Sequence, residues 1–452
     1  MSALPTERQS APRVSRRHAR PATPRTVSSV VPPATSFAAA GVPASLVAAL
    51  AATGITTPFP IQAATLPDAL AGRDILGRGQ TGSGKTLGFS IPLVARLADG
   101  YTSACRPRGL VLVPTRELAS QVHAVLAPLA GAAGLSVATI YGGVPQNPQV
   151  AKLRGRADIV VACPGRLADL IEQDHCDLRD VEISVLDEAD HMADLGFLPV
   201  VRRLLDMTPP DGQRMLFSAT LDSAVDVLAR RFMTRPVHHD VGPVEVPAAM
   251  THHVLTIAPA DRVGVVTALA GGSGRSLVFT RTRHAARRLA RQLNSGGIPA
   301  AELHGDLAQG ARERSLASFA KGTVRVIVAT DVAARGIHVD GIDLVIHADP
   351  PAEHKAYLHR SGRTARAGAA GTVITLQDQA QAANVRTLMR KAGVVPLTAA
   401  VTTGSALLRS IAGEPVARVP LPPARPAAIV AAPAAGRGAA SMSAGFRGRR
   451  RR

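Results

Sequence analysis

The chain has 452 residues, of which 46% are hydrophobic and 3% aromatic, and its formal charge is +19. This length predicts two or three domains with large aliphatic cores. No segment offers ~18 uninterrupted apolar residues, so we expect no membrane-spanning helix and no membrane partner. The three cysteines lack the spacing of a zinc site or a disulfide framework, which favours a reducing cytosol.

The excess positive charge is concentrated at the two ends. Residues 1–34 hold six Arg against one acid and residues 396–452 hold nine against one, so the ends carry 13 of the 19 excess charges. Both are rich in Pro or Ala, and we expect disordered basic tails that favour a polyanionic partner. The alternatives are a solvated tail that reflects compositional bias and, for residues 1–34, an organellar transit peptide.

Between the tails the chain reads as two α/β series. Residues 35–238 and 251–395 each alternate short apolar runs with helical patterns such as 116–129 and 165–173, and residues 239–250 form the expected linker. The pattern predicts two doubly wound parallel sheets. The expected strands lie at 74–77, 109–113, 158–162, 183–187 and 214–217, and then at 276–280, 325–329, 343–347 and 371–376.

A phosphate-binding loop follows the first expected strand. The segment GQTGSGKT at 79–86 fits the pattern G-x-x-x-x-G-K-[ST] and opens a helical pattern. Backbone N–H groups of such a loop surround phosphate oxygens, a lysine adds positive charge, and a hydroxyl can bind Mg²⁺. The expected ATP contacts are Thr81, Gly82, Ser83, Gly84, Lys85 and Thr86.

An acidic pair, Asp187 and Glu188, directly follows the apolar run at 183–186. The carboxyl ends of parallel strands form the ligand-binding edge of such sheets, so this pair is expected beside the phosphate loop. Asp187 is the expected Mg²⁺ ligand together with Thr86, and Glu188 is placed to polarise the attacking water.

At this point the chain resembles the DEAD-box family of ATP-dependent RNA helicases, of bacterial type and built from tandem RecA-like domains. The resemblance covers about residues 35–380 and rests on short segments in the family's order. These are PFPIQ (58–62), PTRELA (114–119), the two glycines at 142–143, PGR (164–166), DEAD (187–190), SAT (218–220), LVFTRT (277–282), HGDLAQGAR (304–312), ATDVAARGI (329–337) and YLHRSGRTARAG (357–368).

The resemblance implies roles for further residues. It implies that Gln62 reads the adenine edge while Phe37 stacks on the base, and that Arg363 and Arg366 are arginine fingers that act with Lys85 in catalysis. The implied RNA contacts are Arg116, Gly143, Arg166, Arg312 and Thr330, and the implied residues that couple hydrolysis to strand separation are Asp190, Ser218, Thr220 and His359.

The implied activity is RNA-stimulated ATP hydrolysis that requires Mg²⁺ and is coupled to closure of the two domains and to local unwinding of RNA duplexes. Single-stranded or duplex RNA would be bound without sequence preference by a cytoplasmic monomer, with ribosome assembly or RNA decay as compatible settings. Two alternatives remain open: a DNA-directed helicase of the same two-domain class, and an RNA-annealing or clamping protein in which turnover is incidental.

Three positions depart from the family pattern. Cys163 stands where Thr commonly precedes PGR, His338 stands where an Asp usually contacts the ribose, and Ala365 replaces a usual Gly. None of these changes touches the expected hydrolytic residues.

Overall fold

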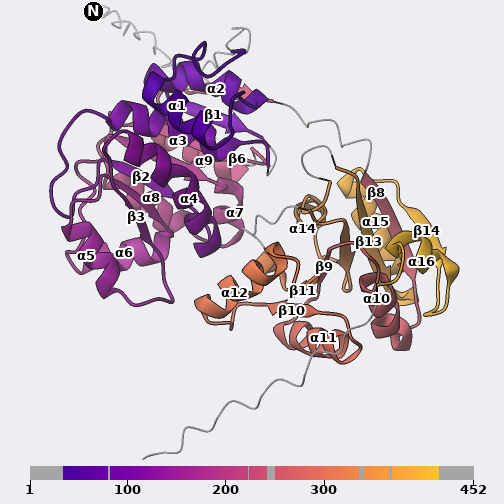
Figure 1. Cartoon of the computed structure of the whole chain (residues 1–452). Coiled ribbons are helices and arrows are strands. Elements are labelled where there is room, and N and C mark those ends of the chain that lie inside the picture. The colour runs from indigo at the N-terminus through magenta and orange to yellow at the C-terminus, as the bar shows by residue number, and fades with distance from the viewer. Residues whose placement is uncertain are drawn as a thin grey trace, which may run out of the picture.

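The computed structural model describes residues 34–79, 82–221, 223–241, 250–334, 341–365 and 369–416. They form two lobes, each a parallel sheet with helices on both faces (Figure 1). The prediction of two doubly wound α/β domains is confirmed. Of the tails expected at 1–34 and 396–452, residues 1–33 and 417–452 lie outside the described residues, as do Thr81, His338 and Arg366.

The first sheet has the strand order β3-β4-β2-β5-β6-β1-β7 within the part of the chain that is described. Its strands are β1 (Ile75–Arg78), β2 (Gly109–Leu112), β3 (Val137–Ile140), β4 (Ile159–Ala162), β5 (Ile183–Asp187), β6 (Gln213–Ser218) and β7 (Val237–Asp240). Its helices are α1 (Ala44–Ala52), α2 (Pro60–Leu70), α3 (Lys85–Leu97), α4 (Arg116–Ala132), α5 (Asn147–Arg154), α6 (Pro164–Glu172), α7 (Ala189–Asp194), α8 (Leu198–Asp206) and α9 (Ser223–Phe232).

The second sheet repeats this plan in the order β10-β11-β9-β12-β13-β8-β14. Its strands are β8 (Met250–Thr256), β9 (Ser276–Phe279), β10 (Ala300–Leu303), β11 (Val326–Ala329), β12 (Leu344–His347), β13 (Gly371–Gln377) and β14 (Leu397–Ala400). Its helices are η1 (Pro259–Asp261), α10 (Arg262–Ala270), α11 (Arg283–Ser295), α12 (Gln309–Ala320), α13 (Asp331–Ala334), α14 (His354–Ser361), η2 (Gln379–Gln381), α15 (Ala382–Ala392) and α16 (Ala406–Ala412).

Each sheet is buried on both faces. In β2, Val111 packs into the cluster beneath one face, whereas Leu110 and Leu112 pack into the cluster on the other. A strand that is buried on both sides gains from apolar residues at every position. This is why the central strands are readable as continuous apolar runs.

The expected end of the second domain at residue 395 is wrong. Strand β14 pairs in parallel with β8, and α16 packs on α10 with Leu408 buried, so the domain extends to at least residue 412. The expected linker also began too early, because β7 runs to Asp240 beside β1. The edge strands β7 (VHHD) and β14 (LTAA) lack a continuous run of large apolar residues because one of their sides is open to solvent.

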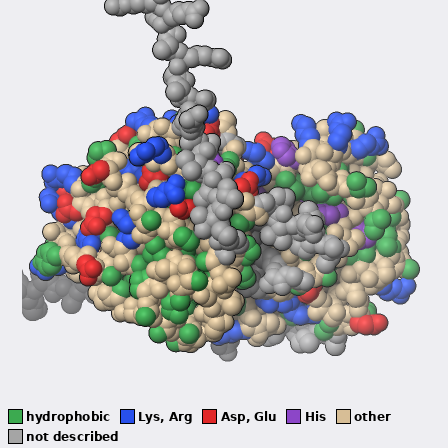
Figure 2. All heavy atoms as spheres, turned by 90° about the horizontal axis from the view of Figure 1, so that it is seen from above, with side chains coloured by type: hydrophobic (Ala, Val, Ile, Leu, Met, Phe, Trp, Pro, Cys, Tyr) green, Lys and Arg blue, Asp and Glu red, His purple; other side chains and the backbone are tan. Residues whose placement is uncertain are grey.

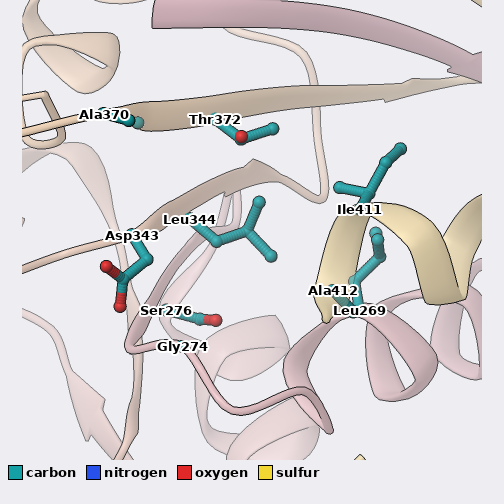
Figure 3. Close-up of a pocket in the computed structure, with 10 residues that line it drawn as sticks. Leu269, Gly274, Ser276, Asp343, Leu344, Ala370, Thr372, Ile411 and Ala412 are labelled. Carbon is teal, nitrogen blue, oxygen red and sulfur yellow. The ribbon is translucent and has the colours of Figure 1, made fainter. Parts of the chain in front are cut away.

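A cavity of about 240 Å³ lies in the second domain, lined by residues that include Gly274, Ser276, Asp343 and Thr372. These residues stand at or just before the starts of β9, β12 and β13. The cavity therefore lies at the opposite edge of the sheet from the loops expected to bind ATP. Figure 3 shows Ile411 of α16 beside the apolar side of this hollow, with the carboxylate of Asp343 pointing away from it.

Basic side chains are spread over both lobes on the face seen from above (Figure 2). No helix in the described ranges is long and apolar enough to span a membrane.

Candidate functional site

The phosphate loop begins where β1 ends and leads into α3. Gly84 precedes the helix with φ of +88°, a left-handed conformation that glycine adopts without strain. Lys85 is buried, and its Nζ donates to the carbonyl oxygen of Gly79 at 2.8 Å. Ser83 Oγ is buried and has no hydrogen-bond partner within the described residues. The loop thus holds a cation and an unsatisfied hydroxyl, a combination that suits a phosphate group.

Gln62 is fixed against this loop. Its side chain accepts from Phe59 N at 2.9 Å and donates from Nε2 to Gly84 O at 2.9 Å. Gln62 is fully buried, so these two bonds set its amide orientation. The expected adenine reader therefore lies beside the phosphate loop.

Phe37 lies in the hydrophobic core and not at an open nucleotide-binding surface, as its expected role would require. Its side chain is 2% exposed and packs in the core cluster of the first domain. A ring that stacks on a base needs an open face, which this arrangement does not offer. The stacking role of Phe37 stays a prediction.

Asp187 ends β5 next to the phosphate loop. Burial raises the pKa of its carboxyl to about 7, although the charge of Lys85 opposes this rise. Its Oδ1 accepts from Glu188 N at 3.0 Å. Among the described residues no group of three or more His, Cys, Asp or Glu side chains could hold a metal. An ion held by Asp187 and Thr86 would therefore complete its shell with phosphate oxygens and water, as Mg²⁺ does in nucleotide sites.

Glu188 sits in a left-handed conformation, with φ of +52°. Non-glycine residues in this region are uncommon and concentrate at functional sites. His191 Nδ1, one turn along α7, lies 3.0 Å from Glu188 Oε2 with both side chains buried. Burial alone would raise the pKa of Glu188, but the hydrogen bond and charge of His191, with the charges of Arg363 and Lys85, lower it to about 2. Glu188 is thus held ionised, so its carboxylate can accept a hydrogen bond from a water molecule at the site.

The expected coupling residues of the first domain form one network. Thr220 donates from both N and Oγ1 to Asp190 Oδ2, each at 3.0 Å, and Asp190 N donates to Ser218 Oγ at 3.3 Å. Because Ser218 ends β6 and Gly79 N donates to its carbonyl at 3.1 Å, the network is joined to the phosphate loop. His359 lies in α14 beside Arg360 and Arg363, and its bond to this network stays a prediction.

Arg363 reaches this site from the second domain. Its side chain is buried, and its charge contributes to the lowered pKa of Glu188. The neighbouring Arg360 has another task, since it binds both oxygens of Asp331 at 2.6 and 2.7 Å. The charge of one expected arginine finger thus acts on Glu188, the expected catalytic carboxylate, across the domain boundary.

The expected RNA contacts of the first domain also cluster. A Cβ on Gly143 would lie 2.1 Å from Arg116 Nη1 and would displace that side chain, and the φ of +73° at this position also favours glycine. Arg166 Nη1 donates to the adjacent Val144 O at 3.4 Å. These residues follow the carboxyl ends of β2, β3 and β4, with Arg116 opening α4, Gly143 in the loop after β3, and Arg166 in α6. A phosphate backbone could be bound along this edge of the sheet.

Arg312 is not free to face solvent in this arrangement. Its Nε donates to Glu117 Oε1 at 2.7 Å, and the other two nitrogens donate to His304 O and Ala333 O. Glu117 belongs to the first domain, so this buried pair joins the two domains. The RNA role of Arg312 stays a prediction, as does that of Thr330, which stands at the end of β11.

Two family models match the chain in the order of its two sheets. The DEAD/DEAH box helicase model covers residues 59–228, and the helicase conserved C-terminal domain model covers residues 262–368. Together they span more than half of the chain. The chain belongs to the DEAD-box helicase family.

Curated DEAD-box relatives agree with this assignment. The chain is 39% identical to DEAD-box ATP-dependent RNA helicase 30 of Arabidopsis thaliana over 84% of this chain and 65% of that protein. It is 42% identical to ATP-dependent RNA helicase DBP3 of Phaeosphaeria nodorum, over 71% of this chain and 56% of that one. The chain thus spans about half to two thirds of the length of such relatives. They are plant and fungal proteins, which gives no support to the expected bacterial type.

A solved structure shares the fold. S. cerevisiae Dbp5 bound to RNA and ADP BeF3 matches with a TM-score of 0.74 at 28% identity, over 84% of this chain and 100% of that chain.

Sequence reasoning missed two residues near the DEAD segment and the phosphate loop. His191 follows DEAD directly, and its position three residues after Glu188 on a helix is the signal that predicts their contact. Phe59 lies within the recognised PFPIQ segment, is 57% exposed, and lies against Gly84. An exposed aromatic ring beside a nucleotide loop is a candidate contact for ligand.

The Glu117–Arg312 pair leads to a test of domain closure. Replacing either residue with its uncharged analogue leaves a charge buried in the closed form, which costs about 3 kcal/mol, or about a hundredfold. We expect Glu117→Gln and Arg312→Gln each to lower RNA-stimulated ATP hydrolysis, and the double variant to lose no more than the worse single variant. Additive losses in a double-mutant cycle contradict this coupling. Glu182→Gln, in an Arg–Glu pair within one domain, is the control.

Proposed function

We propose that this protein is an ATP-dependent RNA helicase, in which ATP and RNA together close the two domains and the RNA-stimulated hydrolysis of ATP then reopens them. The observation that carries the proposal is that the charge of Arg363, from the second domain, helps to lower the pKa of Glu188 in the first. Hydrolysis that needs both residues requires a closed cleft. RNA bound across both domains would favour that closed form, so ATP and RNA should raise each other's affinity.

In the proposed reaction Lys85 and the backbone of the phosphate loop bind the phosphates, and Gln62 orients the base. Mg²⁺, when bound by Asp187 and Thr86, would neutralise phosphate charge. Glu188 accepts the proton of the attacking water, and Arg363 stabilises charge on the γ-phosphate. His191 keeps the carboxylate of Glu188 oriented for this step.

Arg116, Gly143 and Arg166 are proposed to bind phosphates and sugars of RNA, which gives binding without sequence preference. The network of Asp190, Ser218 and Thr220 is proposed to relay loss of the γ-phosphate to this surface, together with His359. We also propose a cytoplasmic location, a monomeric state and action on ribosomal or RNA-decay assemblies. Two relatives are named chloroplastic and mitochondrial, so the compartment needs its own test.

The deciding experiment measures steady-state ATP hydrolysis with no nucleic acid, with single-stranded RNA and with single-stranded DNA of the same length. Strong stimulation by RNA alone supports the proposal, because a 2′-OH is what distinguishes the two strands. Equal stimulation by DNA favours a DNA-directed helicase. Strand annealing that persists in Lys85→Ala without any stimulation favours an annealing protein.

The raised pKa of Asp187 predicts how Mg²⁺ dependence changes with pH. A proton and Mg²⁺ compete for this carboxylate, whose pKa is about 7 without metal. Below that pH the acid is neutral, so the apparent Mg²⁺ affinity should fall by up to tenfold per pH unit, and above it the affinity should level off. Titrating Mg²⁺ against hydrolysis at pH 6, 7 and 8 checks this. An affinity that does not change over that range contradicts a titrating Asp187.

A further inference from the structure

Helix α11 of the second domain carries a stripe of positive charge that the proposed site does not use. The helix holds four arginines and no acidic residue. Its buried side is formed by Ala286, Leu289, Ala290 and Leu293, which pack toward β10 and β11. The stripe (Arg283, Arg287, Arg288 and Arg291) lies on the opposite side, exposed or half-buried.

The charges along the stripe are balanced unevenly. At its start, Arg283 Nη1 pairs with Asp306 at 2.8 Å, and Arg287 Nε lies 3.5 Å from Glu302. Arg288 and Arg291 are exposed and have no ion-pair partner among the described residues. The far half of the stripe is therefore uncompensated, and it needs no rearrangement to accept anionic groups.

The stripe starts at the edge of the sheet where RNA is expected. Helix α11 follows the carboxyl end of β9, and its cap Thr282 accepts from Ala285 N at 3.1 Å. Thr330, a proposed RNA contact, donates from its N to Leu303 O at 3.1 Å, and Asp306 in the loop after Leu303 pairs with Arg283. The stripe thus runs from the expected RNA path along the outer side of the domain.

The length of the stripe suits a nucleic-acid strand. Arg283 and Arg291 are eight residues apart on one helix, which corresponds to about 12 Å and to roughly three phosphates of a strand. Arginine binds phosphate oxygens through several N–H groups, whereas a scattered surface charge gives no such continuous track.

We propose that α11 is an accessory surface for the phosphate backbone of RNA that extends beyond the segment held in the cleft. The proposal rests on the proposed helicase function and adds that the same RNA continues along α11, outside the cleft. It would anchor the protein to long or structured RNA without reading sequence and without taking part in hydrolysis.

The test compares Arg288→Gln/Arg291→Gln with Arg386→Gln/Arg390→Gln. The second pair removes the same charge from exposed positions on α15, which packs on α14. Each protein is titrated with the shortest oligouridylate that saturates ATP hydrolysis and with a much longer one, in several salt concentrations. Circular dichroism checks that all variants are folded.

We expect the α11 variant to bind long RNA roughly tenfold more weakly, with a salt dependence of affinity reduced by about 1.4 in log–log slope. Its affinity for the short RNA and its maximal hydrolysis rate should match wild type. Equal losses in the α15 variant, or an equal loss on short RNA, would overturn the proposal. Absence of RNA stimulation in wild type would instead refute the helicase function itself.

Discussion

Glu188→Gln is expected to abolish RNA-stimulated ATP hydrolysis while preserving binding of ATP and RNA. A glutamine cannot accept the proton of the attacking water, and loss of a general base lowers rates by about 10² to 10⁴-fold. The amide keeps the size of the carboxylate and can still bond His191 Nδ1, which lies 3.0 Å from the native Oε2. The fold should therefore be retained, and an ATP-bound complex with RNA should persist longer than in wild type.

Single-turnover hydrolysis with RNA in excess measures this loss, and an RNA mobility assay with ATP measures the trapped complex. Glu172→Gln is a matched control, since Glu172 is exposed and pairs with Arg203 on the surface of the same domain. Hydrolysis by Glu188→Gln within a factor of a few of wild type would contradict the assignment of the base.

Arg363→Ala is the second change with a large expected effect. An arginine that stabilises charge on a γ-phosphate accelerates related reactions by about 10³ to 10⁵-fold. The phosphate loop and Gln62 lie in the first domain, so binding of ATP should change little. The expected result is a maximal rate that falls by about 10³-fold with a nearly unchanged KM for ATP.

Arg409→Ala is the control for this change, because Arg409 is exposed on α16. Arg363→Lys adds a further test: lysine keeps the charge but not the planar group, so we expect only partial recovery. A variant that loses ATP affinity but keeps its maximal rate would show that Arg363 binds ground-state nucleotide and has no finger role.

The central part of each sheet was predictable from sequence, and the edges were not. Strands such as β4 and β5 are buried on both faces and show continuous apolar runs. The edge strands β3, β7, β10 and β14 face solvent on one side or along one border, and their sequences, such as VHHD in β7, lack that signal. Strand β8, which lies beside the edge strand β14, was not predicted either, because its sequence MTHHVLT is mostly half-buried and shows no continuous apolar run.

The site was predictable where a short motif fixes the chemistry. Lys85, Asp187, Glu188 and Asp190 lie together as their segments imply. The motifs did not predict three side-chain contacts. Phe37 is buried in the core, His191 bonds Glu188, and Arg312 bonds Glu117. Each of these depends on residues that are distant in sequence or that lie outside the motifs.

At Ala365 the backbone is strained in a way that the sequence motif does not reveal. It stands where the family usually has Gly, and its φ is +54°. A left-handed alanine costs roughly 1 to 2 kcal/mol, which glycine would avoid. The strain lies two residues after Arg363, in the loop that carries the arginine to the other domain.

The order of strands along the chain has a consequence for synthesis of the protein. Every partner of the first sheet, β1 to β7, precedes residue 241, and every partner of the second follows residue 249. The amino-terminal domain can therefore fold while the ribosome is still making the second, as domains generally do. A nascent chain at that stage already holds Lys85 and Glu188 but lacks Arg363, so on the proposed roles of these residues we expect it to bind ATP without hydrolysing it until the second domain has been made.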